Sequence, residues 1–340
     1  MRQTDFAKTL TNFLTKYLSG QRNLSANTIK SYRDAFKQLL IYLQNEENIS
    51  PEYLTFKELD KEKIEDFLHW LEKTKKVSIN TRNQRLAAIH SFYRYVQSEN
   101  PENLFESQRI LGIPFKRRVI KTIEYLTADC LEIIFQQPNI DTLKGRRDLT
   151  LMVLLYDSGA RIQELLDLKV RNVRLAKPAT LLLSGKGKKE RYVPIMEKSK
   201  KLLEYYLAEH KLLKNGKEDY PLFFNHSNRP FTRPGITYIL EKYLKVAKEN
   251  HPNIAFPDKL KPHMIRHTKA IHLLEAGVNL IYIRDFLGHA SVTTTEHYAK
   301  VNSQLKRKAL EAAYVEVISE DIPRWTEDQE LISWLQNFCK

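Results

Sequence analysis

The chain has 340 residues, of which 42% are hydrophobic and 28% are charged. This length predicts two domains, because a single hydrophobic core rarely grows past about 250 residues, and the composition excludes an intrinsically disordered chain. Lysine and arginine (55 residues) outnumber aspartate and glutamate (41 residues), which gives a formal net charge of +14. A basic chain attracts polyanions, so nucleic acid is the favoured class of partner, and a solvated lysine-rich surface is the alternative.

Membrane insertion and secretion are both disfavoured. The longest clean apolar run, residues 151–156, is far shorter than the roughly 20 residues that a membrane-spanning helix needs. The N-terminal residues show no apolar stretch followed by a cleavage site. Cys130 and Cys339 are too few, and too far apart in sequence, for a disulfide framework or a zinc cluster. We expect a cytoplasmic protein with reduced thiols and no membrane partner.

Residues 1 to about 100 carry apolar residues at three- and four-residue spacing, which predicts four helices. The first spans residues 5–18, the second follows Ser25 as its N-cap, and the fourth follows Ser78. Polar and basic residues lie near the starts of the second and fourth helices, where free backbone amides can meet phosphates. A solvated helix face is the alternative for these candidate DNA contacts, which are Thr28, Lys30, Arg33, Lys37, Asn80, Thr81, Arg82 and Arg85.

A proline-interrupted, cationic stretch at residues 112–121 loses helical periodicity and predicts a linker between two domains. Its Lys116, Arg117 and Arg118 could lie along a duplex or could simply be exposed. Thr127 then predicts the N-cap of the first helix of a second, largely helical domain.

The second domain contains one hairpin-like exception to its helical pattern. Residues 181–184 and 191–195 are predicted strands that flank a glycine-punctuated turn. Lys186 stands between Gly185 and Gly187 in this turn, where the backbone can approach a partner closely. A solvated hairpin tip is the alternative, and a Walker-type phosphate loop is excluded because no Gly-Lys-Ser/Thr follows at the required spacing.

Arg161 is a candidate anion ligand at a helix start. Gly159 can end one helix, and Arg161 opens the next, where a planar guanidinium and free amides together suit a phosphate. An exposed ion pair between Arg161 and Glu164, three residues later, is the alternative.

A second basic cluster lies on one predicted helix, which begins at Pro262 and ends near Gly277. The spacing places His263, Arg266 and His267 on one face of this helix. Zinc binding by the two histidines is improbable, because a metalloprotease needs glutamate after the first histidine and Arg266 would repel a cation. The same face suits a phosphate.

The last segment of interest, residues 286–299, contains a histidine and a tyrosine nine positions apart. Gly288 predicts a helix end, and Thr293 with Glu296 predicts a capping box for the next helix. His289 follows the first of these signals and Tyr298 lies about one turn into the second helix. A tyrosine on a helix, considered alone, is more often a packing residue than a nucleophile.

Six of these residues together resemble the tyrosine recombinase family in order and spacing, and its Xer-like and phage-integrase-like members most closely. They are Arg161, Lys186, His263, Arg266, His289 and Tyr298. The hairpin at residues 185–191 is similar to the family's catalytic-lysine hairpin, and the Leu-Gly-His, Thr-Thr and Tyr pattern of residues 287–298 is typical of the family. The resemblance covers residues 125–315 and, more weakly, the N-terminal helices.

This resemblance implies a mainly α fold with a small antiparallel β-sheet or hairpin in the catalytic domain, and a C-shaped, two-domain clamp around DNA. It implies a helical, SAM-like core-binding domain, a basic linker, a catalytic domain and a tail helix that docks on a neighbouring protomer. We place these parts at residues 1–108, 109–124, 125–320 and 321–340, respectively.

The chemistry implied by the resemblance uses no metal, cofactor or ATP. Tyr298 attacks a DNA phosphate and forms a 3′-phosphotyrosyl intermediate, while Lys186 protonates the departing 5′ oxygen. The residues expected to bind the phosphate are Arg161, Arg266, His263 and His289, and those expected to orient them are Glu164 and His267. His263 is also a candidate to exchange the proton of the tyrosine.

The implied partners are double-stranded DNA with inverted-repeat sites and three further copies of the chain, or a related recombinase, on two duplexes. The reaction could be integration, excision or resolution, and the long segment after Tyr298 favours a mobile element. A type IB topoisomerase shares the chemistry, and an inactive DNA-binding regulator would share the fold. An RNA-binding or membrane-surface protein would explain only the basic charge.

Overall fold

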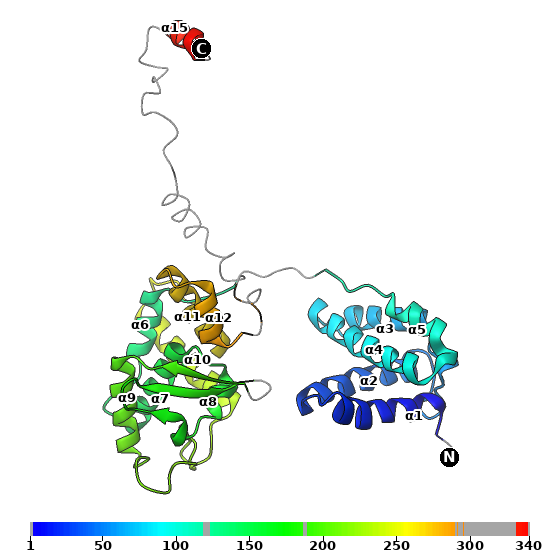
Figure 1. Ribbon diagram of the computed structural model, residues 1–340, viewed down its shortest axis with the longest axis horizontal. Helices are drawn as coiled ribbons and strands as arrows, with labels where there is room; N and C mark the ends of the chain where they lie inside the picture. The colour runs from blue at the N-terminus through cyan, green and yellow to red at the C-terminus, as the bar shows by residue number, and fades with distance from the viewer. Residues whose placement is uncertain are drawn as a thin grey trace. The chain divides into compact units, whose positions relative to one another are not determined.

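The computed structural model describes residues 3–117, 123–185, 189–289, 291, 295 and 331–338. The chain divides into two compact units, Met1–Lys121 and Thr122–Lys340, each with its own buried core (Figure 1). Among the described residues the fold is mainly helical with one small antiparallel sheet, which confirms the predicted fold class.

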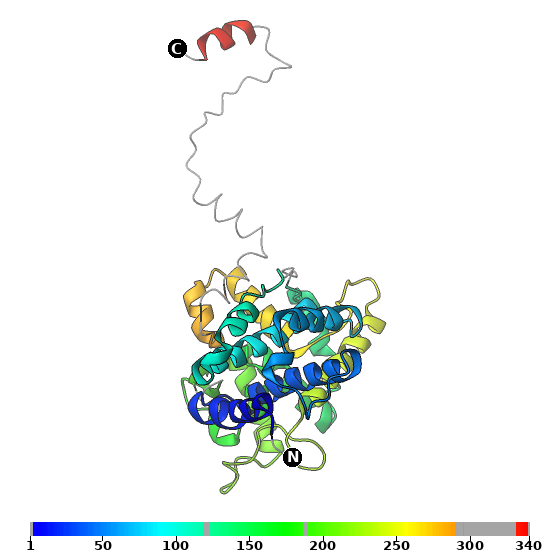
Figure 2. The same cartoon turned by 90° about the vertical axis from the view of Figure 1, so that its right-hand side faces the viewer.

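The first unit is a bundle of helices (Figure 2, blue to cyan). Side-chain oxygens cap the starts of its two longest helices: Ser25 accepts from the Thr28 amide and Ser78 accepts from the Thr81 amide, as predicted. The elements of this unit are α1 (Asp5–Asn12), η1 (Phe13–Gln21), α2 (Ala26–Glu46), η2 (Phe56–Glu58), α3 (Lys61–Lys73), α4 (Ile79–Glu99), η3 (Pro101–Asn103) and α5 (Leu104–Leu111).

The first helix differs from its prediction, because its α-helical part ends at Asn12 and a π-helical segment, η1, continues to Gln21. The hydroxyls of Thr11 and Thr15 donate to carbonyl groups four residues earlier, over 2.8 and 2.6 Å. Such back-bonding competes with the regular backbone ladder and bends helices. The helical backbone ends at Gln21, next to Gly20, near which the sequence predicts the end of this helix.

Aromatic rings fill the core of the first unit. The Phe13 and Phe36 rings pack edge-to-face on Phe92, with ring centroids 5.3 and 5.1 Å from that of Phe92. Ile110 and Ile113 are buried in the same core. This core therefore includes residues beyond position 108, where we placed the end of the first domain.

The second unit contains the sheet and the remaining helices. Thr127 caps its first helix, as predicted. The elements are α6 (Ala128–Gln136), α7 (Leu143–Ser158), α8 (Ile162–Leu166), η4 (Val170–Asn172), β1 (Val173–Arg174), β2 (Thr180–Ser184), β3 (Glu190–Pro194), α9 (Glu197–Glu209), α10 (Arg233–Asn250), α11 (Pro262–Glu275), α12 (Leu280–Leu287) and α15 (Leu331–Asn337).

The predicted hairpin is present as β2 and β3, and the short strand β1 extends it to a three-stranded sheet of order β1-β2-β3. Leu181 pairs with Val193, and both side chains are buried together with Leu183. The alternation expected of a half-buried strand thus fixes the register. That register places Gly185 and Lys189 at the end of the paired region, where the Gly185 amide donates to the Lys189 carbonyl over 2.7 Å.

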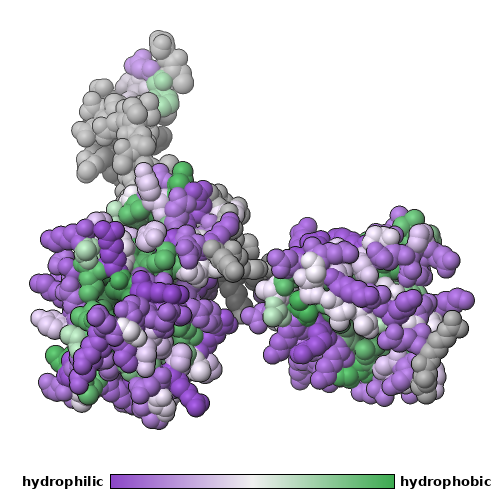
Figure 3. All heavy atoms as spheres, turned by 60° about the horizontal axis from the view of Figure 1, so that its bottom comes forward, coloured by the Kyte–Doolittle hydropathy of each residue, from purple (hydrophilic) through white to green (hydrophobic). Residues whose placement is uncertain are grey.

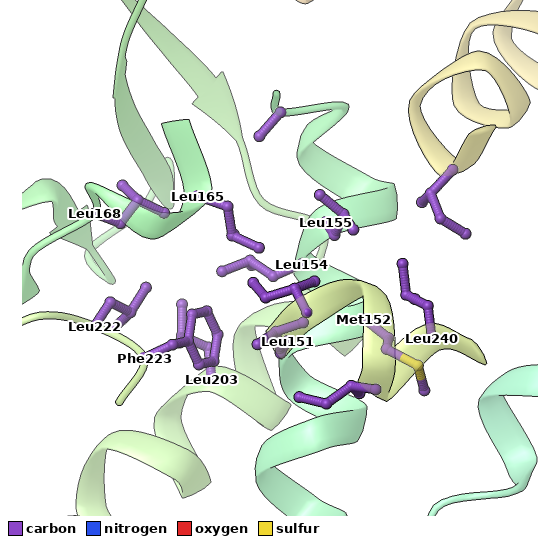
Figure 4. Packing of buried hydrophobic residues seen from close by; sticks show 14 of the residues in the cluster. Leu151, Met152, Leu154, Leu155, Leu165, Leu168, Leu203, Leu222, Phe223 and Leu240 are labelled. Atoms are coloured by element: carbon purple, nitrogen blue, oxygen red, sulfur yellow. The ribbon is translucent and has the colours of Figure 1, made fainter. Parts of the chain in front are cut away.

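Aliphatic side chains from α7, α9 and α10 form the centre of the second core. Figure 4 shows Leu151, Leu154 and Leu155 of α7 beside Leu203 and Leu240. A smaller cluster joins α11 to α12 through Ala270, Ile271, Ile283 and Leu287, all of them buried. This packing holds the C-terminal end of α12 beside the start of α8.

The surface of each unit is largely hydrophilic in the view of Figure 3, with scattered apolar patches. Among the described helices, none is long and apolar enough to cross a membrane. Trp334 lies on the short helix α15 and Phe338 directly follows that helix, and their ring centroids lie 4.7 Å apart.

Candidate active site

Arg161 reaches from the start of α8 towards the end of α12. Gly159 ends α7 with a left-handed backbone (φ 54°), and Arg161 then takes the extended N-cap position of α8. The guanidinium of Arg161 donates from Nη1 to Glu164 Oε1 over 2.7 Å and from Nη2 to the Gly288 carbonyl over 3.1 Å. With its side chain 39% exposed, Arg161 pairs with Glu164 and still faces solvent.

The turn at Gly159 tolerates no larger side chain. A Cβ atom there would lie 2.9 Å from side-chain atoms of both Phe286 and Leu287, and the left-handed backbone itself disfavours other residues. The glycine therefore allows the end of α12 to pack directly against the residues that precede Arg161.

Arg266 lies beneath these two turns. It projects from α11 and is only 1% exposed. Its Nη1 donates to the Gly159 carbonyl and its Nη2 to the Leu287 carbonyl, both over 2.6 Å. Arg266 thus binds the backbone just before Arg161 and the backbone just before His289, which fixes the distance between them.

Three histidines surround the arginines. Burial, followed by the charges of Arg266 and Arg161, lowers the pKa of His289 to about 4. Burial, with His263 and Arg266 as further causes, lowers the pKa of His267 to about 4. Loss of hydration and the same two arginines lower the pKa of His263. At neutral pH these rings are uncharged, so the positive charge of the site comes from its arginines.

The histidine rings also contact one another and the chain beyond α12. The rings of His263 and His267 meet edge-to-face with their centroids 4.3 Å apart. The Nδ1 atom of His289 lies 3.0 Å from the hydroxyl oxygen of Thr295.

Glu164 is the acid that these cations share. The Glu164 side chain is buried, with 4% exposure. Its carboxylate accepts hydrogen bonds from the Arg161 side chain, from the Arg161 backbone amide (2.9 Å) and from the Arg191 side chain. The Nη1 atom of Arg266 lies 4.0 Å from the same carboxylate. Burial raises the pKa of this carboxyl, but hydrogen bonds from Arg191 and Arg161 outweigh burial and lower it to about 2. Glu164 is therefore ionised and binds the Arg161 guanidinium.

Arg191, at the start of β3, is the site residue that the sequence analysis left without a role. Its Nη1 and Nη2 atoms donate to the two oxygens of Glu164 over 3.1 and 2.7 Å, and its Nε donates to the Phe286 carbonyl over 2.9 Å. The sequence offered one signal for it, a basic residue in the strand directly after the predicted lysine turn.

A pocket of about 400 Å³ opens at this point. Its lining residues are Arg161, Gly185, Lys189, Glu190, Arg191, Asp285, Gly288 and His289. Of the six residues predicted to be catalytic, the structure brings together Arg161, His263, Arg266 and His289. Lys186 and Tyr298 lie outside the described residues, as does the predicted capping box at Thr293 and Glu296.

No group of three or more acidic, cysteine or histidine side chains suited to a metal ion occurs within the described ranges. The cationic character of the pocket suits an anion instead.

The predicted DNA contacts of the first unit lie along two neighbouring helices. The Arg85 side chain of α4 donates to Gln38 (2.8 Å) and to the Ser31 carbonyl (3.3 Å) of α2, so the two helices are joined there. The candidate contacts with exposed side chains are Lys30, Lys37 and Asn80. Those that are partly buried, at the helix starts, are Thr28 and Thr81. The exposed Arg33 forms an ion pair with Asp34.

Arg82 departs from the prediction that it faces DNA. Its side chain is buried at 6% exposure, and its Nη1 donates to the Pro114 carbonyl over 3.2 Å. The neighbouring Asn83 binds both backbone polar groups of Lys116, over 2.8 and 3.2 Å. Residue 82 lies on the same face of α4 as Leu86, a position that faces the core, and this periodicity could have revealed its role.

The other linker residues differ among themselves. Lys116 pairs with Glu72 over 2.6 Å while half of its side chain stays exposed, and Arg117 is exposed. Arg118 lies outside the described residues.

Residues 124–304 match the model of the phage integrase family, and residues 10–101 match the N-terminal SAM-like domain of phage integrases. The chain belongs to the phage integrase family. It is a tyrosine recombinase of the Xer-like type, an enzyme that cleaves and rejoins DNA strands. The family resemblance predicted from six residues is thereby confirmed.

Relatives of this recombinase match over nearly their whole length. It is 33% identical over 336 residues to y4rC of Sinorhizobium fredii, whose name describes an integrase/recombinase, and the match covers 99% of both chains. It is 30% identical over 298 residues to tyrosine recombinase XerC of Staphylococcus saprophyticus, covering 87% of this chain and 94% of XerC.

The fold is also that of a solved recombinase. The structure of the XerH site-specific recombinase bound to palindromic difH substrate matches with 24% identity and a TM-score of 0.66, over 86% of this chain and 80% of XerH.

Proposed function

We propose that this recombinase cleaves DNA by attack of Tyr298 on a scissile phosphate held at the pocket of Arg161, Arg191 and His289. The observation that carries the proposal is the convergence of three guanidinium groups on one carboxylate beside His289. Three guanidiniums against a single buried carboxylate leave a net positive charge, which suits an anion. Tyr298 follows His289 by nine residues.

Positive charge is what the reaction needs, because the charge of a phosphodiester repels nucleophiles. Arg161, with 39% of its side chain exposed, would contact a nonbridging oxygen directly. Arg266, 1% exposed and bound to two carbonyl groups, contributes its charge from beneath the pocket. His289 adds a hydrogen bond from a neutral ring.

Two proton transfers complete the strand cleavage. His263, which burial and the arginines keep neutral near pH 7, can accept the phenol proton as Tyr298 attacks. Lys186, whose sequence position falls between β2 and β3, donates a proton to the departing 5′ oxygen. The phosphotyrosyl bond conserves the energy of the broken bond, so a 5′ hydroxyl of a second strand can rejoin without ATP.

We further propose that four copies assemble on two duplexes with inverted-repeat sites and that the enzyme serves a mobile element. The starts of α2 and α4 would contact the DNA backbone, and the basic residues after Pro114 would close a two-domain clamp around it. The amphipathic segment after residue 323 would dock on a neighbouring protomer.

Strand exchange by the purified full chain tests the proposed function. A binding site is selected from a random duplex pool, and two labelled duplexes that carry this site are then mixed with the protein. We expect recombinant duplexes and a covalent protein adduct on nicked duplexes, both at undiminished yield in EDTA because arginines supply the positive charge. Relaxation of supercoiled DNA without strand exchange would instead assign a topoisomerase, and binding without any adduct would assign a regulator.

Removal of residues 324–340 should weaken assembly on DNA more than binding to one site. The segment carries Trp334 and Phe338, whose apolar surface would be covered in the assembled complex. Native gels with one-site and two-site duplexes measure the two steps separately, and the alanine variant of Trp334 should reproduce part of the effect. An unchanged size of the complex would reject the docking role.

A further inference from the structure

Each of the three guanidinium nitrogens of Arg191 donates a hydrogen bond to a group of the candidate active site. Its guanidinium makes a two-pronged contact with Glu164 and a third hydrogen bond to the Phe286 carbonyl. Its side chain is 13% exposed, so these contacts lie in a partly dry environment where they are strong. A Cβ atom on Gly288 would lie 2.8 Å from Arg191 Nη1, which shows how closely the turn before His289 packs on this guanidinium.

The contacts of Arg191 decide what Glu164 can do to Arg161. Glu164 is a buried acid that pairs with Arg161, and an unshared carboxylate would cancel the charge that a phosphate needs. Arg191 occupies an acceptor position on each oxygen of Glu164 and supplies the compensating charge. The charge of Arg161 and Arg266 then remains for the phosphate.

We propose that Arg191 is a positioning residue of the recombinase: it neutralises and orients Glu164, and through Glu164 and the Phe286 carbonyl it holds Arg161 and His289 at the phosphate. This inference rests on the proposed function of the pocket and assigns it one more residue. Arg191 acts through its neighbours, because its donors point to Glu164 and to the backbone of α12.

The test compares an ordinary scissile phosphate with a methylphosphonate, in which a methyl group replaces one nonbridging oxygen and removes the negative charge. A neutral group needs less cationic stabilisation, so a residue that supplies such stabilisation matters less on this substrate. The readout is the rate of adduct formation at saturating protein on nicked duplexes of the selected site.

For Arg191→Gln we expect about a 100-fold slower cleavage of the phosphate substrate, the cost typical of losing one stabilising group. We expect a loss of less than about ten-fold on the methylphosphonate. Arg191→Lys, which keeps the charge but not the two-pronged geometry, should fall between Arg191→Gln and the unchanged protein on the phosphate substrate. This lysine variant also keeps the test informative if the glutamine variant folds poorly.

Arg147→Gln is the matched control. The Arg147 side chain is also 13% exposed and pairs with the buried Asp148 through Nε and Nη2, but it is not among the residues that line the pocket. This variant should lose stability, measured by thermal unfolding, yet keep the unchanged ratio of phosphate to methylphosphonate cleavage rates.

The outcomes separate the inference from the function on which it rests. Equal losses on both substrates for Arg191→Gln and Arg191→Lys, as for a general loss of folding, would overturn the positioning role. Unchanged cleavage by both variants would overturn it as well. Absence of any adduct with the unchanged protein would instead reject the proposed function.

Discussion

Replacing Tyr298 with phenylalanine is expected to abolish covalent attachment to DNA while leaving binding to the selected site unchanged. The substitution removes only the phenol oxygen that would form the new bond to phosphorus in the proposed mechanism. Loss of a nucleophile costs on the order of 10⁶-fold in well-studied hydrolases, so the adduct should fall below detection. Denaturing gels of nicked duplexes measure the adduct, and mobility shifts measure binding.

Tyr282→Phe provides the control for this experiment. Tyr282 is 71% exposed on α12, in the same unit of the protein, and it is not among the residues that line the pocket. Its phenylalanine variant should form the adduct at the normal rate. Full adduct yield from Tyr298→Phe would show that another residue attacks the phosphate.

The second large effect is expected on stability, from Glu164→Gln. The side chain is 4% exposed and shares its charge with Arg161, Arg191 and Arg266. A pKa of about 2, against 4.5 for the free group, corresponds to about 3 kcal/mol of stabilisation. Loss of one partner of a buried ion pair costs about 3–5 kcal/mol, in agreement. Urea unfolding at pH 7 should therefore show a loss of about 3 kcal/mol.

The pH dependence gives this prediction a second check. Because the pKa of Glu164 is lower in the folded than in the unfolded protein, its stabilisation is complete above about pH 4.5 and is lost as the pH falls towards 2. The difference between the two proteins should thus shrink below pH 4.5. Glu249→Gln, at an exposed pair with Lys245, should change stability by less than about 1 kcal/mol at any pH. A Glu164 variant as stable as the unchanged protein at pH 7 would contradict the shared-carboxylate geometry.

Local signals in the sequence predicted the local structure of the site well. The glycines at 159 and 288 end their helices with left-handed backbones, and Pro262 begins α11, as expected. Two short, largely apolar segments on either side of a glycine-punctuated turn located both strands of the hairpin to within one residue. Each of these features depends on residues close in sequence, where propensity and periodicity apply.

The tertiary part of the site could not be predicted in this way. Arg191 binds Glu164, 27 residues earlier, and the Phe286 carbonyl, 95 residues later. The local sequence Glu-Arg-Tyr at the start of β3 does not indicate which acidic residue the arginine will bind. For Arg82 the sequence did contain the deciding signal. Its basic character favoured a contact with DNA, but its position on α4 places it on the face that is buried in the core.

The contacts of Arg266 have a consequence for protein synthesis. This side chain joins the carbonyl of Gly159, 107 residues before it, to that of Leu287, 21 residues after it. A chain still emerging from the ribosome has Arg161 long before it has the end of α12, so its cations are not yet gathered at one place. The anion pocket can therefore form only once the end of α12 has been synthesised and has packed on α11.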